Sequence, residues 1–325
     1  MVRNNLILTD LFMKKNVIVI AGATASGKSS AALDICTSLD GELISCDSMQ
    51  IYRKMNIGTA KPTEAEMTAV RHHLIDVREP WEDFSSSDYV SLAKPAIDDV
   101  LHRGKLPVVC GGTGLYLDSL MFIRPDEACS VDEKLRGELL ARDKHENWLM
   151  LSQIDPESAE KIHENNIKRV VRALEIYYLT GKTKSEIDKT QLVKDETYNY
   201  MIFVLSYRNR EILYDRINRR VDIMLEEGLE REIRELLQSG ELKEGTTAYQ
   251  AIGYKELIGY INGQMTLDEA VESLKQATRN YAKRQITWFS RYKDAEFVYA
   301  DDFSSKNEVS EYIVNRIREK GKERG

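Results

Sequence analysis

Apolar residues along this chain are grouped in two distinct patterns, short continuous runs and longer amphipathic stretches. Continuous runs rich in β-branched residues are typical of strands buried on both faces of a sheet. Such runs occupy residues 16–21, 42–46, 105–110 and 200–206. Helix-like segments lie between or after them, at 29–39, at 86–101 with Ser86 or Ser87 as the expected N-cap, and at 115–122. This alternation predicts an α/β fold, a parallel sheet flanked by helices on both faces.

The pattern changes at Arg124-Pro125, where strand-like runs cease until residue 200. Polar helical segments follow one another at 132–143, 156–162 and 167–180, and Gly181 stands at the position of a helix C-cap. Because strand-like runs precede and follow this block, we expect an all-helical insertion, residues 124–199, in one α/β core made of residues 13–123 and 200–325. Amphipathic helices complete the core, one with Leu213, Ile217, Val221, Met224 and Leu225 on one face and another from 267 to about 291.

Composition narrows the class of protein further. Hydrophobic residues make up 42% of the 325, enough for a substantial core, and no run of 18 apolar residues predicts a membrane-spanning helix. Residues 1–12 resemble neither a strand nor a signal peptide, so we expect a disordered N-terminal extension. The four cysteines are far apart and form no C-x-x-C, which favours a reducing, cytoplasmic setting. We also expect a monomer.

One segment carries a specific phosphate-binding pattern. It follows a buried strand, precedes a helix, fits G-x-x-x-x-G-K-[ST], and consists of Gly22, Ala23, Thr24, Ala25, Ser26, Gly27, Lys28 and Ser29. Glycines let several backbone N–H groups face one anion, and the helix N-terminus and the lysine add positive charge. The Ser29 hydroxyl stands where a Mg²⁺ bridging phosphate oxygens would bind. The alternative is a glycine turn that binds nothing. The fold expectation thereby becomes a P-loop NTPase-like sheet.

The acid nearest to this loop at a strand end is Asp47. Hydrolysing enzymes with such loops usually carry a carboxylate after a later strand, but the strand 106–110 ends in Gly111-Gly112-Thr113 instead. Asp47 is therefore a better candidate for handling a nucleophile than for holding a metal. Its other interpretation is a cap for the following turn.

Taken together, these segments resemble the tRNA dimethylallyltransferase (isopentenyltransferase) family. The matching stretches occur in family order, cover roughly residues 14 to 293, and are 22–29, 43–52, 57–62, 73–76, 111–116, 220–225, 250–256 and 283–289. Ala23 stands where proline is common in the family, and Ser29 where threonine is common. Serine keeps the hydroxyl that faces the metal.

The resemblance implies a donor, an acceptor and roles for individual residues. The loop would bind the diphosphate of dimethylallyl diphosphate, and the acceptor would be N6 of the adenosine at tRNA position 37. Asp47 would act as general base on that amine. Arg220, with Arg216 one helical turn earlier, would stabilise the diphosphate, and Thr24 and Thr113 would lie near the reacting groups. The segment of Asp47, Ser48, Met49 and Gln50 would contact a flipped-out base.

Net charge is −7, so any RNA surface must be local. The stretch 279–293 contains no acid and combines Arg279, Lys283, Arg284, Arg291 and Lys293 with Tyr281, Trp288, Phe289 and Tyr292. Cations beside aromatic rings suit a single-stranded RNA loop, although the rings could equally be core and the charges a solvated face. On the resemblance, the residues expected to contact the tRNA anticodon stem-loop further include Lys168, Arg169, Arg172, Gln250 and Gln285.

Two other functions remain open at this point. An ATP-binding kinase for a small molecule or nucleoside would keep the P-loop, Asp47 and Arg220, but would leave the acid-free basic stretch unexplained. An RNA-binding protein with a purely structural loop would not need Asp47.

Overall fold

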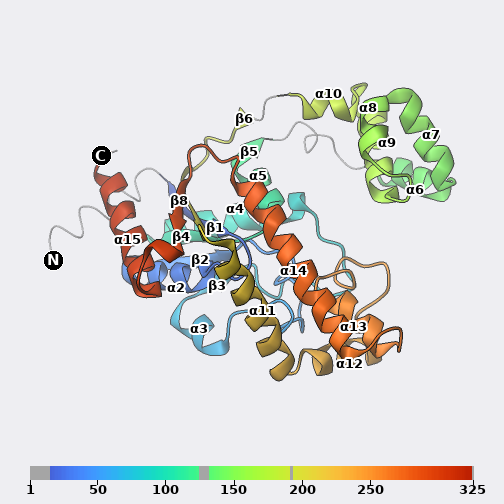
Figure 1. Ribbon diagram of the computed structural model, residues 1–325. Coiled ribbons are helices and arrows are strands. Elements are labelled where there is room, and N and C mark those ends of the chain that lie inside the picture. The colour runs from blue at the N-terminus through green and yellow to red at the C-terminus, as the bar shows by residue number, and fades with distance from the viewer. Residues whose placement is uncertain (1–14, 124–131, 191–192, 324–325) are drawn as a thin grey trace. The chain divides into compact units, whose positions relative to one another are not determined.

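The computed structural model describes residues 15–123, 132–190 and 193–323 (Figure 1). The chain divides into two compact units, one formed by Met1–Leu120 with Glu196–Gly325 and the other by Met121–Asp195. The sequence analysis placed the insertion at 124–199. The expected N-terminal extension, residues 1–12, lies outside the described residues.

The first unit is built on a six-stranded sheet in the order β3-β2-β4-β1-β7-β8, in which every pair of neighbours is parallel. The strands are β1 (Asn16–Gly22), β2 (Gly41–Ser45), β3 (His72–His73), β4 (Leu106–Gly111), β7 (Asn199–Ser206) and β8 (Glu296–Tyr299). Every residue of β1, β2 and β4 is buried, as their continuous apolar runs predict. The predicted parallel α/β sheet is confirmed. The edge strands β3 and β8 were not predicted, because they are too short to show a pattern.

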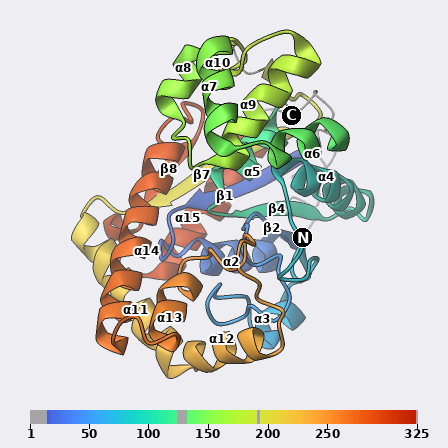
Figure 2. The ribbon, with the colours of Figure 1, turned by 90° about the vertical axis from the view of Figure 1, so that its right-hand side faces the viewer.

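Helices cover both faces of this sheet (Figure 2). On one face, α2 (Lys28–Leu39) and α15 (Lys306–Glu323) share a hydrophobic cluster with side chains such as Ile18, Val108 and Phe203. The opposite face is covered by α4 (Ser86–His102), which contacts β2 and β4. The remaining helices of this unit are α3 (Glu64–Ala69), α5 (Gly114–Met121), α11 (Arg210–Glu226), α12 (Leu229–Gln238), α13 (Tyr254–Ile261), α14 (Leu267–Phe289) and the 3-10 turn η1 (Ala300–Asp302).

Local capping explains where the helices begin. The N-cap of α4 is Ser85. Its hydroxyl accepts a hydrogen bond from the Asp88 N–H, and the Asp88 carboxylate accepts one from the Ser85 N–H. The expectation of Ser86 or Ser87 was therefore wrong by one or two positions; three serines in a row offer the same chemistry, and only the reciprocal bond with Asp88 selects one. The same capping box, Thr266 with Glu269, opens α14.

The second unit is a small helical body with its own core. It contains α6 (Glu133–Ala141), α7 (Lys144–Ile154), α8 (Pro156–Lys161), α9 (Ile167–Thr180), α10 (Lys184–Asp188) and the antiparallel pair β5 (Phe122–Ile123) and β6 (Val193–Lys194). Leu139, Leu151 and Leu174 pack at its centre. The carboxylate of Glu175 is fully buried there and accepts two bonds from the Arg136 guanidinium, at 2.6 and 2.9 Å. Gly181 caps α9 with a φ of 72°, as predicted.

Two further expectations concern the setting of the protein. Across residues 15–123, 132–190 and 193–323, the structure contains no helix that combines the length and the apolar character needed to cross a membrane. Cys36, Cys46 and Cys110 are buried free thiols.

The order of the strands brings the candidate chemistry to one edge of the sheet. The P-loop follows β1, Asp47 follows β2, and Gly112-Thr113 follow β4, which lies between the other two. Carboxyl ends of parallel strands meet at the same edge, where α/β proteins bind their ligands. The turns after β2 and β4 touch, since a Cβ added to Gly111 would lie 1.9 Å from the Cys46 carbonyl oxygen.

Candidate active site

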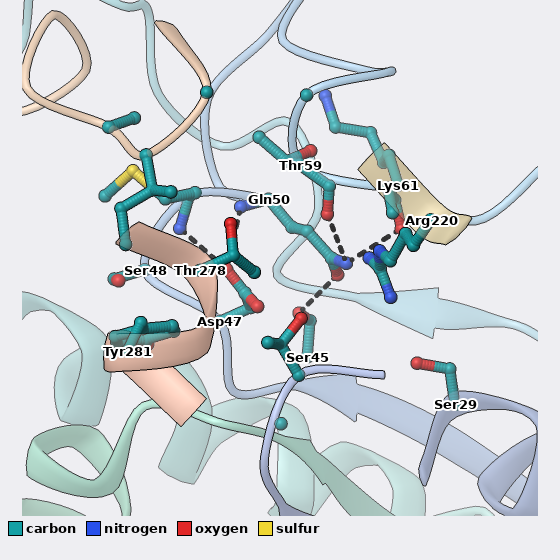
Figure 3. Close-up of a pocket in the computed structure, with 18 of the residues that line it drawn as sticks. Ser29, Ser45, Asp47, Ser48, Gln50, Thr59, Lys61, Arg220, Thr278 and Tyr281 are labelled. Atoms are coloured by element: carbon teal, nitrogen blue, oxygen red, sulfur yellow. Dashed lines mark hydrogen bonds between the residues drawn. The ribbon is translucent and has the colours of Figure 1, made fainter. Parts of the chain in front are cut away.

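A cavity of about 530 Å³ opens at this edge of the sheet, and its walls come from the first unit alone (Figure 3). The P-loop forms one wall, the turn after β2 another, and α11 and α14 close it from the side of the C-terminal half. The residues that line the cavity include Thr24, Lys28, Ser29, Asp47, Gln50, Lys61, Arg220, Thr278, Tyr281 and Arg284.

The P-loop has the conformation that a phosphate cradle needs. Gly27 adopts a φ of 95° immediately before α2, and Ala25 adopts a φ of 60°, which is rare for a residue with a side chain. Helix α2 therefore begins at the cavity, with the Lys28 side chain beside it. Lys28 Nζ donates to the Ala23 carbonyl oxygen at 3.2 Å. Such a loop binds anions through backbone N–H groups and helix polarity.

Two cations of this cavity, Lys28 and Arg220, are half-buried. Burial lowers the pKa of each, and the negative charge of Asp47 raises it in part. Arg220 lowers the pKa of Lys28 further, because like charges repel. A bound anion would remove both penalties, so the cavity is electrostatically suited to a diphosphate.

Arg216 lies beside the P-loop but does not line the cavity. Its Nε donates to the Ala25 carbonyl oxygen at 2.9 Å, and its guanidinium lies 5.6 Å from the centre of the Tyr207 ring. This bond holds the loop at its strained residue. The structure thus places Arg216 behind the loop, as a support for its backbone.

The Asp47 carboxylate is oriented by its own turn. Its Oδ1 accepts from the N–H groups of Met49 and Gln50, at 2.9 and 3.3 Å, and the side chain lines the cavity. In Figure 3 it lies near Thr278 and Tyr281 of α14, and its charge contributes to the raised pKa of Tyr281, whose main cause is burial. Asp47 therefore caps its own turn and also faces the cavity, and its role toward a nucleophile stays a prediction.

Thr113 is placed differently from Asp47. It is not among the cavity-lining residues; its hydroxyl accepts from the Ser48 N–H at 3.0 Å and bonds to the Ser48 hydroxyl at 3.3 Å. Its N–H donates to the Cys46 carbonyl oxygen at 3.2 Å. Thr113 thus clamps both sides of Asp47 and acts as a positioning residue.

Ser48, Met49 and Gln50 all line the cavity, but the Gln50 amide is occupied by protein. Its oxygen accepts from the Ser45 hydroxyl at 3.2 Å, and its nitrogen donates to the carbonyl oxygens of Thr59 and Ala60, at 3.3 and 3.2 Å (Figure 3). Gln50 therefore links β2 to the loop that forms the next wall.

That loop is held by a carboxylate that the sequence analysis missed. Glu232 of α12 is buried and accepts from the N–H groups of Asn56, Ile57 and Gly58, at 2.8, 2.8 and 3.1 Å. It also accepts from the Tyr254 hydroxyl at 2.7 Å, and burial raises the pKa of that tyrosine. The sequence does contain one indication that Glu232 is buried: it lies on the apolar stripe of α12 with Leu229, Ile233 and Leu236.

Lys61, next in the same loop, has a structural role. Its Nζ donates to the Tyr52 carbonyl oxygen, to Asn56 Oδ1 and to Asp76 Oδ1, at 2.8, 2.9 and 2.6 Å. Although it lines the cavity, its three donors are directed at protein, and burial lowers its pKa. The three bonds fix the loop together with those of Glu232.

The basic stretch of α14 divides into an outer and an inner face. Lys283 and Arg284 are exposed, and they lie 5.6 Å from the ring centres of Tyr214 and Tyr281. Farther along, Arg291 lies 4.3 Å from the ring centre of Trp288 and pairs with Asp118 at 3.1 Å. Cations stacked on aromatic rings at a cavity mouth suit single-stranded RNA.

Gln285, one residue after Arg284, does not share that surface. It is 5% exposed; its Oε1 accepts from the Thr24 N–H and its Nε2 donates to the Gly112 carbonyl oxygen, both at 2.8 Å. The helix turns by about 100° per residue, so this position faces inward and lines the cavity, and the expected RNA contact stays a prediction.

The other residues expected at an RNA surface are accessible to different degrees. Gln250 is exposed at the cavity rim. In the helical unit, Lys168 and Arg169 are exposed at the start of α9, while Arg172 pairs with the buried Glu175 at 3.4 Å.

The residues around the cavity suit only one mode of metal binding. No group of three His, Cys, Asp or Glu side chains that could hold an ion occurs in the part of the chain that the structure describes. The Ser29 hydroxyl does line the cavity, beside the P-loop cations. This donor set fits a hard cation that arrives with phosphate and keeps most of its water.

A phosphate-binding loop that faces a fixed carboxylate, with exposed cations and aromatic rings at the rim, defines a group transferase with a phosphorylated donor. The family model described as IPP transferase matches residues 50–292. The chain belongs to the family of tRNA dimethylallyltransferases, which are tRNA-modifying prenyltransferases.

Individual relatives agree over nearly the whole chain. The tRNA dimethylallyltransferase of Caldanaerobacter subterraneus is 43% identical over 94% of this chain and 98% of its own length, and that of Acetivibrio thermocellus is 45% identical over 90% and 95%. The crystal structure of the full-length tRNA isopentenylpyrophosphate transferase from Bacillus halodurans is 42% identical, with a TM-score of 0.71 over 96% of this chain and 98% of that one. A eukaryotic dimethylallyltransferase, solved acting on tRNA, is 30% identical, with a TM-score of 0.76 over 92% and 80%. These relationships do not favour the kinase alternative.

The Glu232 anchor generates a stability prediction. Glu232→Gln should destabilise the protein by about 1–3 kcal/mol, because a buried carboxylate that accepts hydrogen bonds through both oxygens is replaced by an amide that can accept through one oxygen only. Thermal unfolding measures the loss, and hydrogen exchange should quicken at residues 56–58. Glu235→Gln, on the exposed side of α12, is the matched control and should stay within about 0.5 kcal/mol. Equal effects of the two substitutions would contradict the anchoring role.

Proposed function

We propose that this protein transfers the dimethylallyl group of dimethylallyl diphosphate to N6 of the adenosine at tRNA position 37, next to the anticodon. The observation that carries this proposal is the shared cavity, in which a P-loop with its cations faces the oriented carboxylate of Asp47. The family, whose relatives are named for this transfer to tRNA, supplies the chemical context.

The donor would lie with its diphosphate in the P-loop. As the allylic C–O bond breaks, the bonding electron pair leaves with the diphosphate, and charge grows on the oxygen that bridged carbon and phosphorus. Lys28, Arg220 and the loop's N–H groups are preorganised donors for that charge in a partly dry cavity. Their positive charges would interact favourably with a departing diphosphate.

The acceptor amine needs help from a base. Adenine N6 is a weak nucleophile, because its lone pair is delocalised into the ring. An Asp47 carboxylate that accepts a hydrogen bond from this amine raises its electron density and takes its proton as the C1–N6 bond forms. Because two backbone N–H groups already hold Oδ1, the carboxylate keeps one orientation while the base enters.

Magnesium fits this arrangement as a companion of the donor. The Ser29 hydroxyl would contribute one ligand, with phosphate oxygens and water supplying the others. When bound, the ion would neutralise part of the diphosphate charge.

The RNA would reach the cavity from the side of α14. We propose that Lys283, Arg284 and Gln250 contact the anticodon loop, and that Lys168, Arg169 and Arg172 of the helical unit contact the stem-loop. Adenosine 37 would have to leave its stack to enter the cavity, with Ser48, Met49 and the Gln50 backbone nearest to it. We also propose a monomer working in the cytosol, where its buried thiols stay reduced.

One assay tests the function directly. Purified protein, Mg²⁺, dimethylallyl diphosphate and unmodified tRNA should yield an adenosine that is heavier by one C5H8 unit after digestion, located at position 37 by mass spectrometry of RNA fragments. A chelator should suppress the product, and re-added Mg²⁺ should restore it. Absence of the heavier adenosine with folded protein would overturn the proposal.

Asp47 can be tested within the same assay. Asp47→Asn should lower single-turnover prenylation by ~10²-fold or more, since a positioned base typically contributes that much, while tRNA binding is retained. The matched control, Asp215→Asn, alters an exposed carboxylate of α11 and should leave the rate unchanged. An Asp47 variant with normal turnover would show that this carboxylate is not the base.

The RNA-binding surface has its own test at Lys283, which is exposed and does not line the cavity. Lys283→Ala should weaken tRNA binding and reduce the slope of log affinity against log salt by about one, the value for one lost phosphate contact. The Michaelis constant for dimethylallyl diphosphate should not change. Arg231→Ala, whose side chain is 75% exposed on α12, is the control. An unaltered salt slope for Lys283→Ala would exclude it from the RNA surface.

A further inference from the structure

The side chain of Gln285 joins two turns at the carboxyl edge of the sheet. Its amide oxygen accepts from the N–H of Thr24 in the P-loop, and its amide nitrogen donates to the carbonyl oxygen of Gly112 after β4. Both bonds are 2.8 Å long, and the residue is 5% exposed. An amide so placed is satisfied at both ends and has a single orientation.

The fit around this amide is close on the side of β4. A Cβ built on Gly112 would lie 2.2 Å from Gln285 Nε2, so any side chain at Gly112 would displace the glutamine. The contact of the amide with the P-loop is equally specific. Thr24 lines the cavity, but its N–H is already used by Gln285 and is therefore not one of the donors for a bound phosphate.

We propose that Gln285 is a positioning residue for the donor site: by fixing the Thr24 peptide against Gly112, it aims the Thr24 side chain into the cavity and holds the P-loop at a set distance from the turn that clamps Asp47. This role rests on the proposed use of the loop for dimethylallyl diphosphate. It differs from an RNA contact, since it acts on the donor and not on the tRNA.

The position of Gln285 also ties the donor site to the tRNA surface. It lies on α14 directly after Lys283 and Arg284, which are exposed, and four residues after Tyr281, which lines the cavity. A helix is stiff over one turn, so a shift of its outer face moves its inner face as well. Contacts made by RNA on α14 would therefore reach the P-loop through Gln285, and also through Ala282 and Ile286, which pack with Ala23 and Ala25.

Steady-state kinetics with both substrates varied test this role. Gln285→Met keeps the length of the side chain and removes both hydrogen bonds. It should lower kcat/KM for dimethylallyl diphosphate by ~10–100-fold, the cost of misplaced reacting groups, while the Michaelis constant for tRNA stays within about twofold. Gln276→Met, an exposed glutamine on the same helix, is the matched control and should behave as the unaltered protein.

A double-mutant cycle with Thr24→Ala makes the test specific. If Gln285 acts by aiming Thr24, Gln285→Met should cost less than about threefold more in the Thr24→Ala background, because the aimed group is already gone. Full additivity, or a raised Michaelis constant for tRNA with an unchanged one for the donor, would overturn the role. Should Gln285→Met unfold at the assay temperature, Gln285→Glu keeps an acceptor for the Thr24 N–H and must show the same donor-specific loss. A failure of the proposed function can be distinguished from a failure of this role for Gln285, because in the first case the unaltered protein would form no product.

Discussion

The contact between the turns that follow β2 and β4 is the constraint on which the site depends. The Cys46 N–H donates to the Cys110 carbonyl oxygen at 2.7 Å, and Gly111 lies so close to the Cys46 carbonyl that no side chain fits between them. β4 also pairs with β1, whose end opens into the P-loop. The distance from the phosphate cradle to Asp47 is thus set by backbone contacts across one strand. Loops alone would leave this distance variable, and catalysis by positioning does not tolerate that.

The cations that line the cavity differ in the partners that their charges have. Lys61 directs its ammonium at three protein oxygens, so its charge is compensated within the fold. Lys28 donates to one carbonyl oxygen at 3.2 Å, and its neighbour Arg220 repels it. Desolvated like charges destabilise a folded protein until an anion joins them. A phosphate group bound by this loop would relieve that repulsion.

Sequence patterns predicted the features that depend on local order and missed those that depend on contact. The glycine loop, the buried strands and Asp47 at a strand end are local, and the parallel sheet follows from their alternation. Glu232 and Gln285 act through bonds to residues more than 170 positions away. No residue near them in the sequence indicates those partners. Gln285 was expected at the tRNA from the family resemblance alone, and its bonds to Thr24 and Gly112 could not be predicted from its neighbours in the sequence.

The same helix geometry explains how one element can serve two substrates. Positions three or four apart share a face, so Thr278, Tyr281 and Arg284 line the cavity together, while Lys283 falls on the outside. Gln285, four residues after Tyr281, returns to the inner side and reaches the P-loop. A single α-helix thus carries both the exposed Lys283 and the side chain that binds the P-loop.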